Sequence, residues 1–241
     1  MDMKKIITCA VLLSGVVFFN GRLNAQVESD IVGYTTITME AGKWYQVGCP
    51  FATLDDGIAP SLTTMFSAGF AEGDVAYIFS QDDGTYTTTR TWGTPATGNA
   101  TWLNARGKAS DVELTFGQAV FIKKATASDV TFAGKVEASE VVSFGSASGA
   151  TWSQIIFPYP VATDLNEMKW EGLTQGDTLH LYDPVQGTYV ISRTWTVGKT
   201  ADDSELKWRN SRGKDVETII PSGSAMFIQK NAAGVATLSV K

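Results

Sequence analysis

The chain has 241 residues, of which 44% are hydrophobic and 18% are charged, and its formal net charge is −6. A chain of this length and apolar content can bury a substantial core, which excludes a disordered protein. The acidic balance and the lack of a basic stripe argue against nucleic acid as a partner.

The chain begins with an export signal. Two lysines precede the apolar run Ile6–Phe19, and the small-residue ending Leu23-Asn24-Ala25 follows it. This pattern predicts cleavage after Ala25, and the apolar run is too short to span a bilayer as a stable anchor. Once the signal peptide 1–25 is removed, we expect a secreted, periplasmic or cell-surface protein with no membrane span.

Removal of the signal leaves an acidic chain with a single thiol. Residues 26–241 have a net charge of −8, and Cys9 is lost with the signal, so Cys49 cannot form an internal disulfide. One cysteine and one histidine are too few for a structural zinc site. We therefore expect no metal and no cofactor.

Two blocks of the sequence occur twice. Residues 73–92 and 176–195 are identical at 8 of 20 positions, and residues 102–124 and 208–230 are identical at 10 of 23. Chance would give roughly two or three identities over both blocks. The sequence therefore predicts a tandem duplication of most of the exported chain.

The duplication divides the chain into a first repeat unit, residues 26–136, and a second, residues 137–241. The junction has no proline and no run of glycine or serine, so we expect the units to pack together. Threonine occurs 28 times, about double its ordinary usage, and it favours half-buried positions in sheets. The predicted fold is mainly β, a tandem pair of β-sandwich or barrel-like units of about 105 residues, each with one short helix.

A helix and a hairpin are predicted in the first unit. The helix is expected at Ser61–Phe66, where a leucine and a methionine three residues apart share one face. The hairpin joins strands Val75–Ser80 and Thr85–Trp92 through an Asp-Gly turn. In the second unit, the helix is expected to begin at Asp164, because Glu167 stands at the capping-box distance from it.

Further strands are predicted after the hairpin in each unit. Gly117 and Gly223 occupy the same place between two of these strands, which suits a tight turn. Both units are therefore expected to end in the same succession of strands. The predicted strands are 112–116, 119–123 and 130–132 in the first unit, and 217–220, 225–229 and 235–240 in the second.

Three side-chain types recur on one face of the second hairpin strand. Strand alternation puts a tyrosine, an arginine and a tryptophan there in both units. They can form a platform for a sugar ring or an acidic polymer, because indole faces attract C–H edges and guanidinium pairs with carboxylates. Alternatively the face is half buried and its arginine pairs with Asp74 or Asp177, since aromatic residues in strands usually serve packing. The residues are Tyr86, Arg90 and Trp92, and Tyr189, Arg193 and Trp195.

A second shared motif has the form Trp-x-Asn-x-Arg-Gly-Lys. Asparagine and arginine beside a tryptophan can hold a glycan, with donors and acceptors around an apolar floor. Alternatively the asparagine bonds to the backbone and the arginine pairs with Asp111 or Glu217, which locks a loop. The candidate binding residues are Trp102, Asn104 and Arg106, and Trp208, Asn210 and Arg212.

The sequence does not point to catalysis. Its groups of acidic residues lie in predicted loops and do not recur between the units, and no nucleophile elbow or phosphate-binding glycine loop is found. Cys49 and His180 correspond to Phe157 and Tyr77 in the other unit, which predicts a buried thiol and an ordinary strand residue. We therefore expect a protein that is not an enzyme.

The sequence Gly-Lys-Trp-Tyr-Gln-Val-Gly-Cys-Pro-Phe at 42–51 and the ending Gly-x-Ala-x-Phe-Ile-x-Lys at 117–124 and 223–230 carry a family likeness. With a Gly-Asp pair before a strand, they resemble uncharacterised exported two-repeat β-proteins of the Planctomycetes and Verrucomicrobia group. That family usually has Gly-x-Gly-Phe-Phe where this chain has 117–121. The resemblance implies an envelope or extracellular protein and supplies no catalytic residues.

Two functional hypotheses follow. The first is an exported, non-enzymatic surface, matrix or assembly protein, whose partner is an envelope or extracellular polymer or a second copy of the chain. The second is a carbohydrate-binding module that uses the shared Trp, Arg and Asn residues. Two such sites would raise the apparent affinity for a polymer by about a hundredfold if both engage it together.

Overall fold

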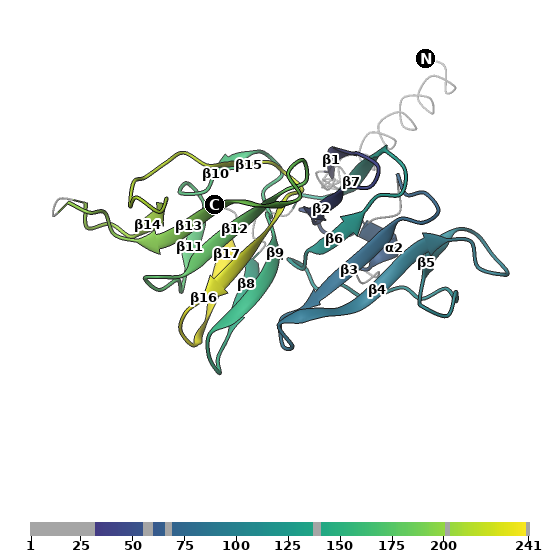
Figure 1. Cartoon of the computed structure of the whole chain (residues 1–241), viewed down its shortest axis with the longest axis horizontal. Coiled ribbons are helices and arrows are strands. Elements are labelled where there is room, and N and C mark those ends of the chain that lie inside the picture. Colours follow the sequence, from purple (N-terminus) through teal and green to yellow (C-terminus); the bar gives the residue numbers. More distant parts are fainter. Residues whose placement is uncertain (1–31, 55–59, 66–68, 137–140, 201–202, 240–241) are drawn as a thin grey trace, which may run out of the picture. The chain divides into compact units, whose positions relative to one another are not determined.

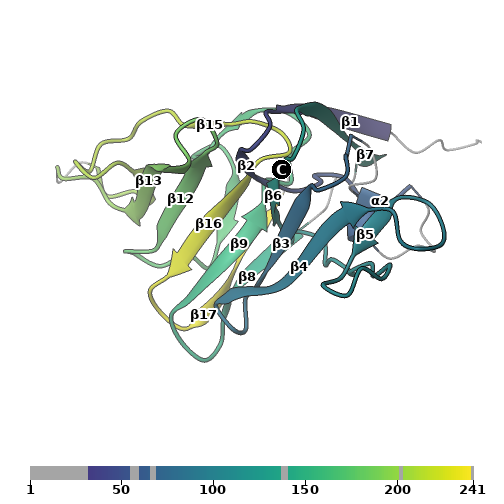
Figure 2. The ribbon, with the colours of Figure 1, turned by 45° about the vertical axis from the view of Figure 1, so that its right-hand side comes forward.

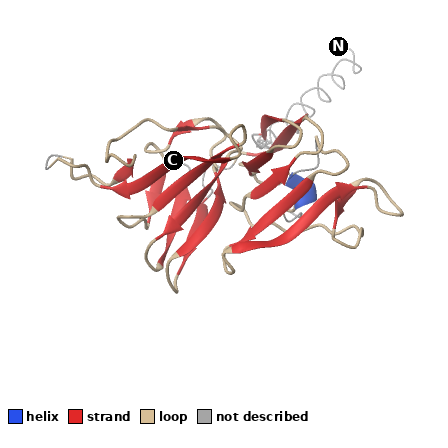
Figure 3. Cartoon of the chain, viewed as in Figure 1, coloured by secondary structure: helices blue, strands red, loops and turns tan. Residues whose placement is uncertain are grey.

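The structure, a computed structural model, describes residues 32–54, 60–65, 69–136, 141–200 and 203–239. The predicted signal peptide and the junction at 137–140 lie outside these residues. Val32–Lys241 forms one compact unit of antiparallel strands (Figure 1). The predicted mainly β fold is confirmed, and the helix that the described residues contain is a single turn (Figure 3).

The elements of the first half are, in chain order, β1 (Val32–Met39), β2 (Trp44–Val47), α2 (Leu62–Met65), β3 (Val75–Ser80), β4 (Thr85–Gly93), β5 (Thr101–Leu103), β6 (Val120–Lys123) and β7 (Ser128–Lys135). Five of them form a sheet in the order β2-β6-β3-β4-β5, while β1 pairs with β7. The predicted hairpin is β3–β4. Its turn requires the glycine, because Gly84 has a φ of +64°.

The elements of the second half are β8 (Val141–Ser146), β9 (Thr151–Ile156), β10 (Thr163–Asp164), β11 (Lys169–Glu171), β12 (Thr178–Asp183), β13 (Thr188–Thr196), β14 (Lys207–Arg209), β15 (Ile219–Ile220), β16 (Ala225–Lys230) and β17 (Gly234–Ser239). The main sheet has the order β14-β13-β12-β16-β9, and Figure 2 shows β12, β16 and β9 side by side. A three-stranded sheet, β11-β17-β8, and the short pair β10-β15 accompany it.

The two main sheets have the same strand order, element for element. The tryptophan pair Trp92↔Trp102 in β4–β5 has its counterpart in the pair Trp195↔Trp208 in β13–β14. The first hairpin has its register shift after Ile78, and the second has its shift after Leu181, the matching position. The topology thus repeats where the sequence blocks match, while the boundaries at 136 and 137 stay a prediction.

Each half buries its own apolar core. Phe51, Trp102 and Ile122 belong to one cluster, and Phe157 and Trp208 belong to the other. Ala119 of the first half packs into the second cluster, so the two cores meet. This agrees with the expectation that the units pack together.

The halves meet through contacts that come in matching pairs. Gly48 N donates to Gly223 O at 3.1 Å, and Ile156 N donates to Gly117 O at 2.9 Å. Gly48 corresponds to Ile156 and Gly223 to Gly117, so the second contact is the first with the halves exchanged. Such an arrangement is the intramolecular equivalent of a two-fold dimer interface.

The two matching glycines turn the chain tightly, as predicted. Gly117 has a φ of +91° and Gly223 a φ of +79°. A Cβ atom at Gly117 would lie 2.6 Å from Val142 Cγ1, which is closer than packed carbon atoms approach. Glycine is therefore required at Gly117 both for the turn and for the close approach of β8.

Three expectations about local structure were wrong. The second unit has no helix in its described residues: Asp164 ends β10, and its side chain accepts hydrogen bonds from the backbone of Asn166 and of Thr218 instead of capping a helix. Nearby, Trp170 lies in β11 opposite Leu238. The predicted strand 112–116 is only an isolated bridge between Glu113 and Ser61. The predicted strand 217–220 is only the two-residue β15, which pairs with β10. Neither stretch joins a main sheet, because each bonds to the segment that precedes the hairpin of its half.

Candidate functional site

The shared tryptophans are packing residues. Trp102 and Trp208 have none of their surface exposed, and Trp92 and Trp195 are half buried. The ring centres of Trp92 and Trp102 are 5.3 Å apart, and those of Trp195 and Trp208 are 5.4 Å apart. A ligand at the surface therefore cannot reach two of the four indoles that the sequence suggested for binding.

The shared arginines bond within their own half. Arg90 Nε donates to Ser110 O at 2.9 Å, and Arg193 Nε donates to Thr218 Oγ1 at 3.0 Å. The predicted pairing of these arginines with Asp74 or Asp177 is wrong, because both carboxylates are bonded to buried lysines. Both arginines are thus engaged on a half-buried face, as the packing alternative expected.

A buried Lys–Asp pair lies in each half, and the sequence analysis missed it. Lys230 Nζ lies 2.7 Å from Asp177 Oδ2 and donates to Gly172 O at 2.8 Å. In the first half, Lys124 forms the same pair with Asp74 and donates to Gly69 O at 2.8 Å. All four charged side chains have none of their surface exposed. The sequence contained an indication of these pairs, since both lysines and both aspartates are identical residues inside the repeated blocks.

The Asp177 carboxylate is fully supplied with hydrogen-bond donors. The backbone N–H groups of Thr174 and Asn231 donate to it at 2.8 and 2.9 Å, in addition to Lys230. Burial alone would raise the pKa of Asp177, but these donors outweigh it, and the pKa lies below its ordinary value. The pair is a structural charge cluster and has no room for a substrate.

The shared asparagines lock their loops, as the second interpretation of that motif expected. Asn104 Oδ1 accepts from the backbone N–H groups of Arg106 at 2.9 Å and Lys108 at 3.3 Å. Asn210 Oδ1 does the same for Arg212, at 3.0 Å, and for Lys214. This side chain therefore holds the turn that contains the Arg-Gly-Lys sequence.

The arginines of this motif point to solvent. Arg106 and Arg212 are exposed, and among the described residues neither forms an ion pair. The predicted pairing with Asp111 or Glu217 is therefore wrong. Asp111 Oδ1 instead accepts from the backbone of Thr63 and of Val112.

The shared tyrosines belong to two aromatic clusters, which sequence reasoning also missed. Tyr86 is 37% exposed and Tyr189 is 39% exposed. Partial burial raises the pKa of Tyr86 to about 12, so its hydroxyl is protonated at neutral pH. The first aromatic cluster consists of Trp44, Tyr77, Tyr86, Phe121 and Tyr182. The second aromatic cluster consists of Trp152, His180, Tyr189, Phe227 and Phe79.

Each aromatic cluster takes its fifth ring from the other half, and the two clusters touch, with ring centres 5.4 Å apart for Phe79 and Tyr86 and 5.3 Å apart for Tyr182 and Tyr189. The ring centres of Phe121 and Tyr182 are 4.8 Å apart in the first cluster, and those of Phe227 and Phe79 are 5.0 Å apart in the second. Because the members of each cluster come from five strands and both halves, no local pattern in the sequence brings them together. The sequence contained only a hint, since the two clusters contain three pairs of residues that the halves share: Trp44 and Trp152, Tyr86 and Tyr189, and Phe121 and Phe227.

One cavity among the described residues also involves both halves. It has a volume of about 770 Å³ and is lined by β1 and β2 of the first half and by β12, β13 and residues 219–225 of the second. A cavity of about 630 Å³ at the matching place is lined by β3, β4, residues 112–118 and β8. The two cavities are lined by corresponding elements with the halves exchanged, and the hydrogen bonds between the halves show the same exchange. They are therefore a consequence of how the halves pack.

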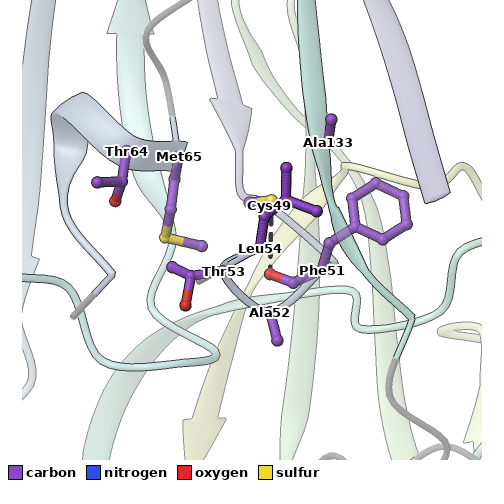
Figure 4. Close-up of a pocket in the computed structure, with 8 residues that line it drawn as sticks. All are labelled: Cys49, Phe51, Ala52, Thr53, Leu54, Thr64, Met65 and Ala133. Carbon is purple, nitrogen blue, oxygen red and sulfur yellow. Dashed lines mark hydrogen bonds between the residues drawn. The ribbon is translucent and has the colours of Figure 1, made fainter. Parts of the chain in front are cut away.

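Cys49 lies in a smaller pocket, of about 200 Å³, close to Phe51 and Met65 (Figure 4). It is 2% exposed, and its thiol donates to Phe51 O at 3.6 Å. Burial raises the pKa of Cys49 to about 11. The predicted buried thiol is confirmed.

The native protein is expected to protect Cys49 from alkylation. At pH 8 the raised pKa keeps the thiol protonated, so we expect iodoacetamide to react about a hundredfold more slowly than in the urea-unfolded chain. Peptide mass mapping separates this cysteine from Cys9. Equal rates in the native and unfolded protein would show that the pocket exposes a thiolate.

His180 lies in β12 and has hydrogen-bond partners on both ring nitrogens. Nδ1 lies 2.9 Å from Ser192 Oγ, and Nε2 lies 3.3 Å from Thr178 Oγ1. Burial lowers the pKa of His180, which keeps the imidazole neutral at pH 7. The predicted strand residue is confirmed.

No family model, curated protein or solved structure matches this chain. Within the described residues, no three or more His, Cys, Asp or Glu side chains are grouped so that they could hold a metal ion. None of the described helical segments is long and apolar enough to cross a membrane. The function must therefore be argued from the site geometry itself.

Proposed function

We propose that this chain is an exported, non-enzymatic protein that serves as a surface, matrix or assembly component. The observation that carries the proposal is that most of the residues shared by the two halves are buried or hold turns. Trp102 and Trp208 are buried, the two Lys–Asp pairs are buried, and the two asparagines hold turns. Side chains that recur in both halves thus support a scaffold.

The carbohydrate-binding alternative has weaker support. It needs the shared tryptophans at a surface, and Trp102 and Trp208 contribute none. Acid/base chemistry is likewise unsupported by geometry among the described acids, since Asp203 pairs with Arg209 and Glu205 with Lys207 at the edge of the fold. The predicted signal peptide, with its expected cleavage after Ala25, and the resemblance to exported repeat proteins favour a role outside the cytoplasm.

An unpaired strand edge offers a route to assembly. Within the described residues, β1 pairs with β7 alone, so the opposite edge of β1 has no strand partner. The eight residues of β1 include no charge and no proline, and Val32 and Tyr34 are 58% and 77% exposed. Long uncharged edges lack the usual protection against pairing with another chain. We infer that two copies pair antiparallel through β1.

Placing charge on β1 is expected to abolish this association. The double variant Val32→Lys and Tyr34→Lys should sediment as a monomer, whereas the wild-type chain should form a dimer whose fraction rises with concentration, because like charges oppose each other across the strand pair. Analytical ultracentrifugation measures both.

Val235→Lys is the matched control, since Val235 is 55% exposed but lies in β17, which is flanked by two strands. This variant should dimerise like the wild type. A wild-type chain that stays monomeric at all concentrations, and that cell fractionation finds free of the envelope, would refute the proposal.

A further inference from the structure

The second aromatic cluster surrounds an open pocket, and of its lining residues only Tyr189 was a candidate binding residue in the sequence analysis. Its volume is about 270 Å³, and its lining consists of the five rings of the cluster and Gly84. Trp152 is 38% exposed and Tyr189 is 39% exposed, so the pocket opens to solvent. It is distinct from the strand edge of β1.

Three rings of the pocket stand nearly at right angles to Phe227, while Trp152 and His180 are tilted at 41° to each other. The interplanar angle is 80° between Trp152 and Phe227, 74° between Tyr189 and Phe227, and 88° between Phe79 and Phe227. A sugar ring is normally held on a flat aromatic platform with polar groups at its rim. Rings at right angles instead wall a volume on several sides, which suits a compact ligand.

The electrostatics of the pocket favour a cation. Aromatic faces carry negative charge density and attract positive charge, most strongly at tryptophan. The lining includes no cationic residue, since burial lowers the pKa of His180 and keeps it neutral. The turn that supplies Gly84 also contains Asp82 and Asp83, and both are exposed.

The first aromatic cluster already holds a cation of its own. Lys123 Nζ lies 5.6 Å from the centre of the Trp44 ring, and Lys123 is the cross-strand partner of Trp44. In the second aromatic cluster, the cross-strand partner of Trp152 is Gln229. Among the described residues, an ammonium group thus lies over Trp44, and none lies over the matching Trp152.

We propose that the pocket of the second aromatic cluster binds a small alkylammonium ion, with Trp152, Tyr189 and Phe227 around its methyl groups. Methylated ammonium suits this lining because it is charged yet needs no hydrogen-bond acceptor, and the rings of Trp152, Phe79 and Phe227 offer none. This inference does not depend on self-association or on the compartment of the protein.

Choline and its uncharged isostere 3,3-dimethylbutan-1-ol test the proposal. They have nearly the same shape, so a difference in affinity reports the charge. We expect saturable choline binding at one site by calorimetry, with a Kd of the order of 1 mM, and at least about tenfold weaker binding of the alcohol. Equal affinity for both, or no saturable choline binding, would overturn the proposal.

Variants locate the site and test the role of the missing lysine. Trp152→Ala should weaken choline binding by about tenfold or more, and Trp152→Phe by less, because phenylalanine keeps a weaker cation-binding face. Gln229→Lys should abolish binding, since it would put an ammonium over Trp152 as Lys123 does over Trp44. Lys123→Gln, at the matching position of the first cluster, should leave this site intact. Unchanged affinity in both Trp152→Ala and Gln229→Lys, with the fold verified by circular dichroism, would refute the assignment.

Discussion

Lys230→Met is expected to lower the free energy of unfolding by about 3–5 kcal/mol, because it leaves the buried Asp177 carboxylate without its counter-ion. The lysine stem is replaced by an apolar side chain of similar length, so the effect reports the lost charge and the lost hydrogen bond to Gly172 O. Adding Asp177→Asn to this variant should recover part of the loss, because the remaining buried group is then neutral. Urea unfolding at pH 7 measures all three proteins.

The exposed pair Lys169–Glu171 provides the matched control. Its side chains are 52% and 62% exposed, and Lys169→Met should cost less than about 1 kcal/mol. A cost below about 1 kcal/mol for Lys230→Met as well would show that the buried pair does not stabilise the fold.

The same pair predicts acid sensitivity. The native pKa of Asp177 lies below its ordinary value of 3.8, so its ionised form contributes stability above pH 3.8. That contribution is lost as the pH falls from 3.8 through the lower native value. The wild-type protein should therefore lose more stability than the doubly substituted variant over this range. Parallel pH profiles for the two proteins would contradict this account.

Trp208→Ala is expected to cost about 3–5 kcal/mol of unfolding free energy, because it removes a fully buried indole and leaves a cavity that the surrounding strands cannot close. Trp170 and Trp195 each lie 5.4 Å from its ring centre and would lose their packing partner. The equivalent Trp102→Ala is expected to have a similar effect.

Trp152→Ala is the matched control for this prediction, since Trp152 is 38% exposed on the strand at the edge of its sheet. It should cost clearly less than Trp208→Ala in thermal and urea unfolding. Near-ultraviolet circular dichroism should show the loss of fixed aromatic packing in Trp208→Ala. Equal costs for the two substitutions would mean that burial in the core does not decide the contribution of these tryptophans.

Local signals in the sequence were enough to predict the mainly β fold and several of its elements. The β3–β4 hairpin follows from an Asp-Gly turn between two β-prone runs, and the turn at Gly117 follows from a residue that tolerates positive φ. The buried thiol of Cys49 was predicted because an aromatic residue takes its place in the other half. Each of these depends on a few neighbouring residues or on a direct comparison of the two halves.

The second predicted helix shows where local signals lose to tertiary contacts. Asp164 and Glu167 have the spacing of a helix cap, but Asp164 bonds to Thr218 across the fold and Trp170 pairs into a sheet. A single helical turn is worth too little to compete with such packing. Tertiary contacts also determine the partner of Arg90. Asp74 is paired with Lys124, and Arg90 donates to the backbone carbonyl of Ser110 instead.

The sequence alone was enough to predict a mainly β protein with two similar halves in its primary structure, and it predicts export, because export signals, strand propensity and repeats are written in neighbouring residues. Tertiary structure alone decided which shared side chains are buried, which charges pair, and which rings from the two halves gather around one pocket. These depend on residues about 50 to 150 positions apart, whose meeting is set by the free energy of packing the whole chain rather than by any local pattern.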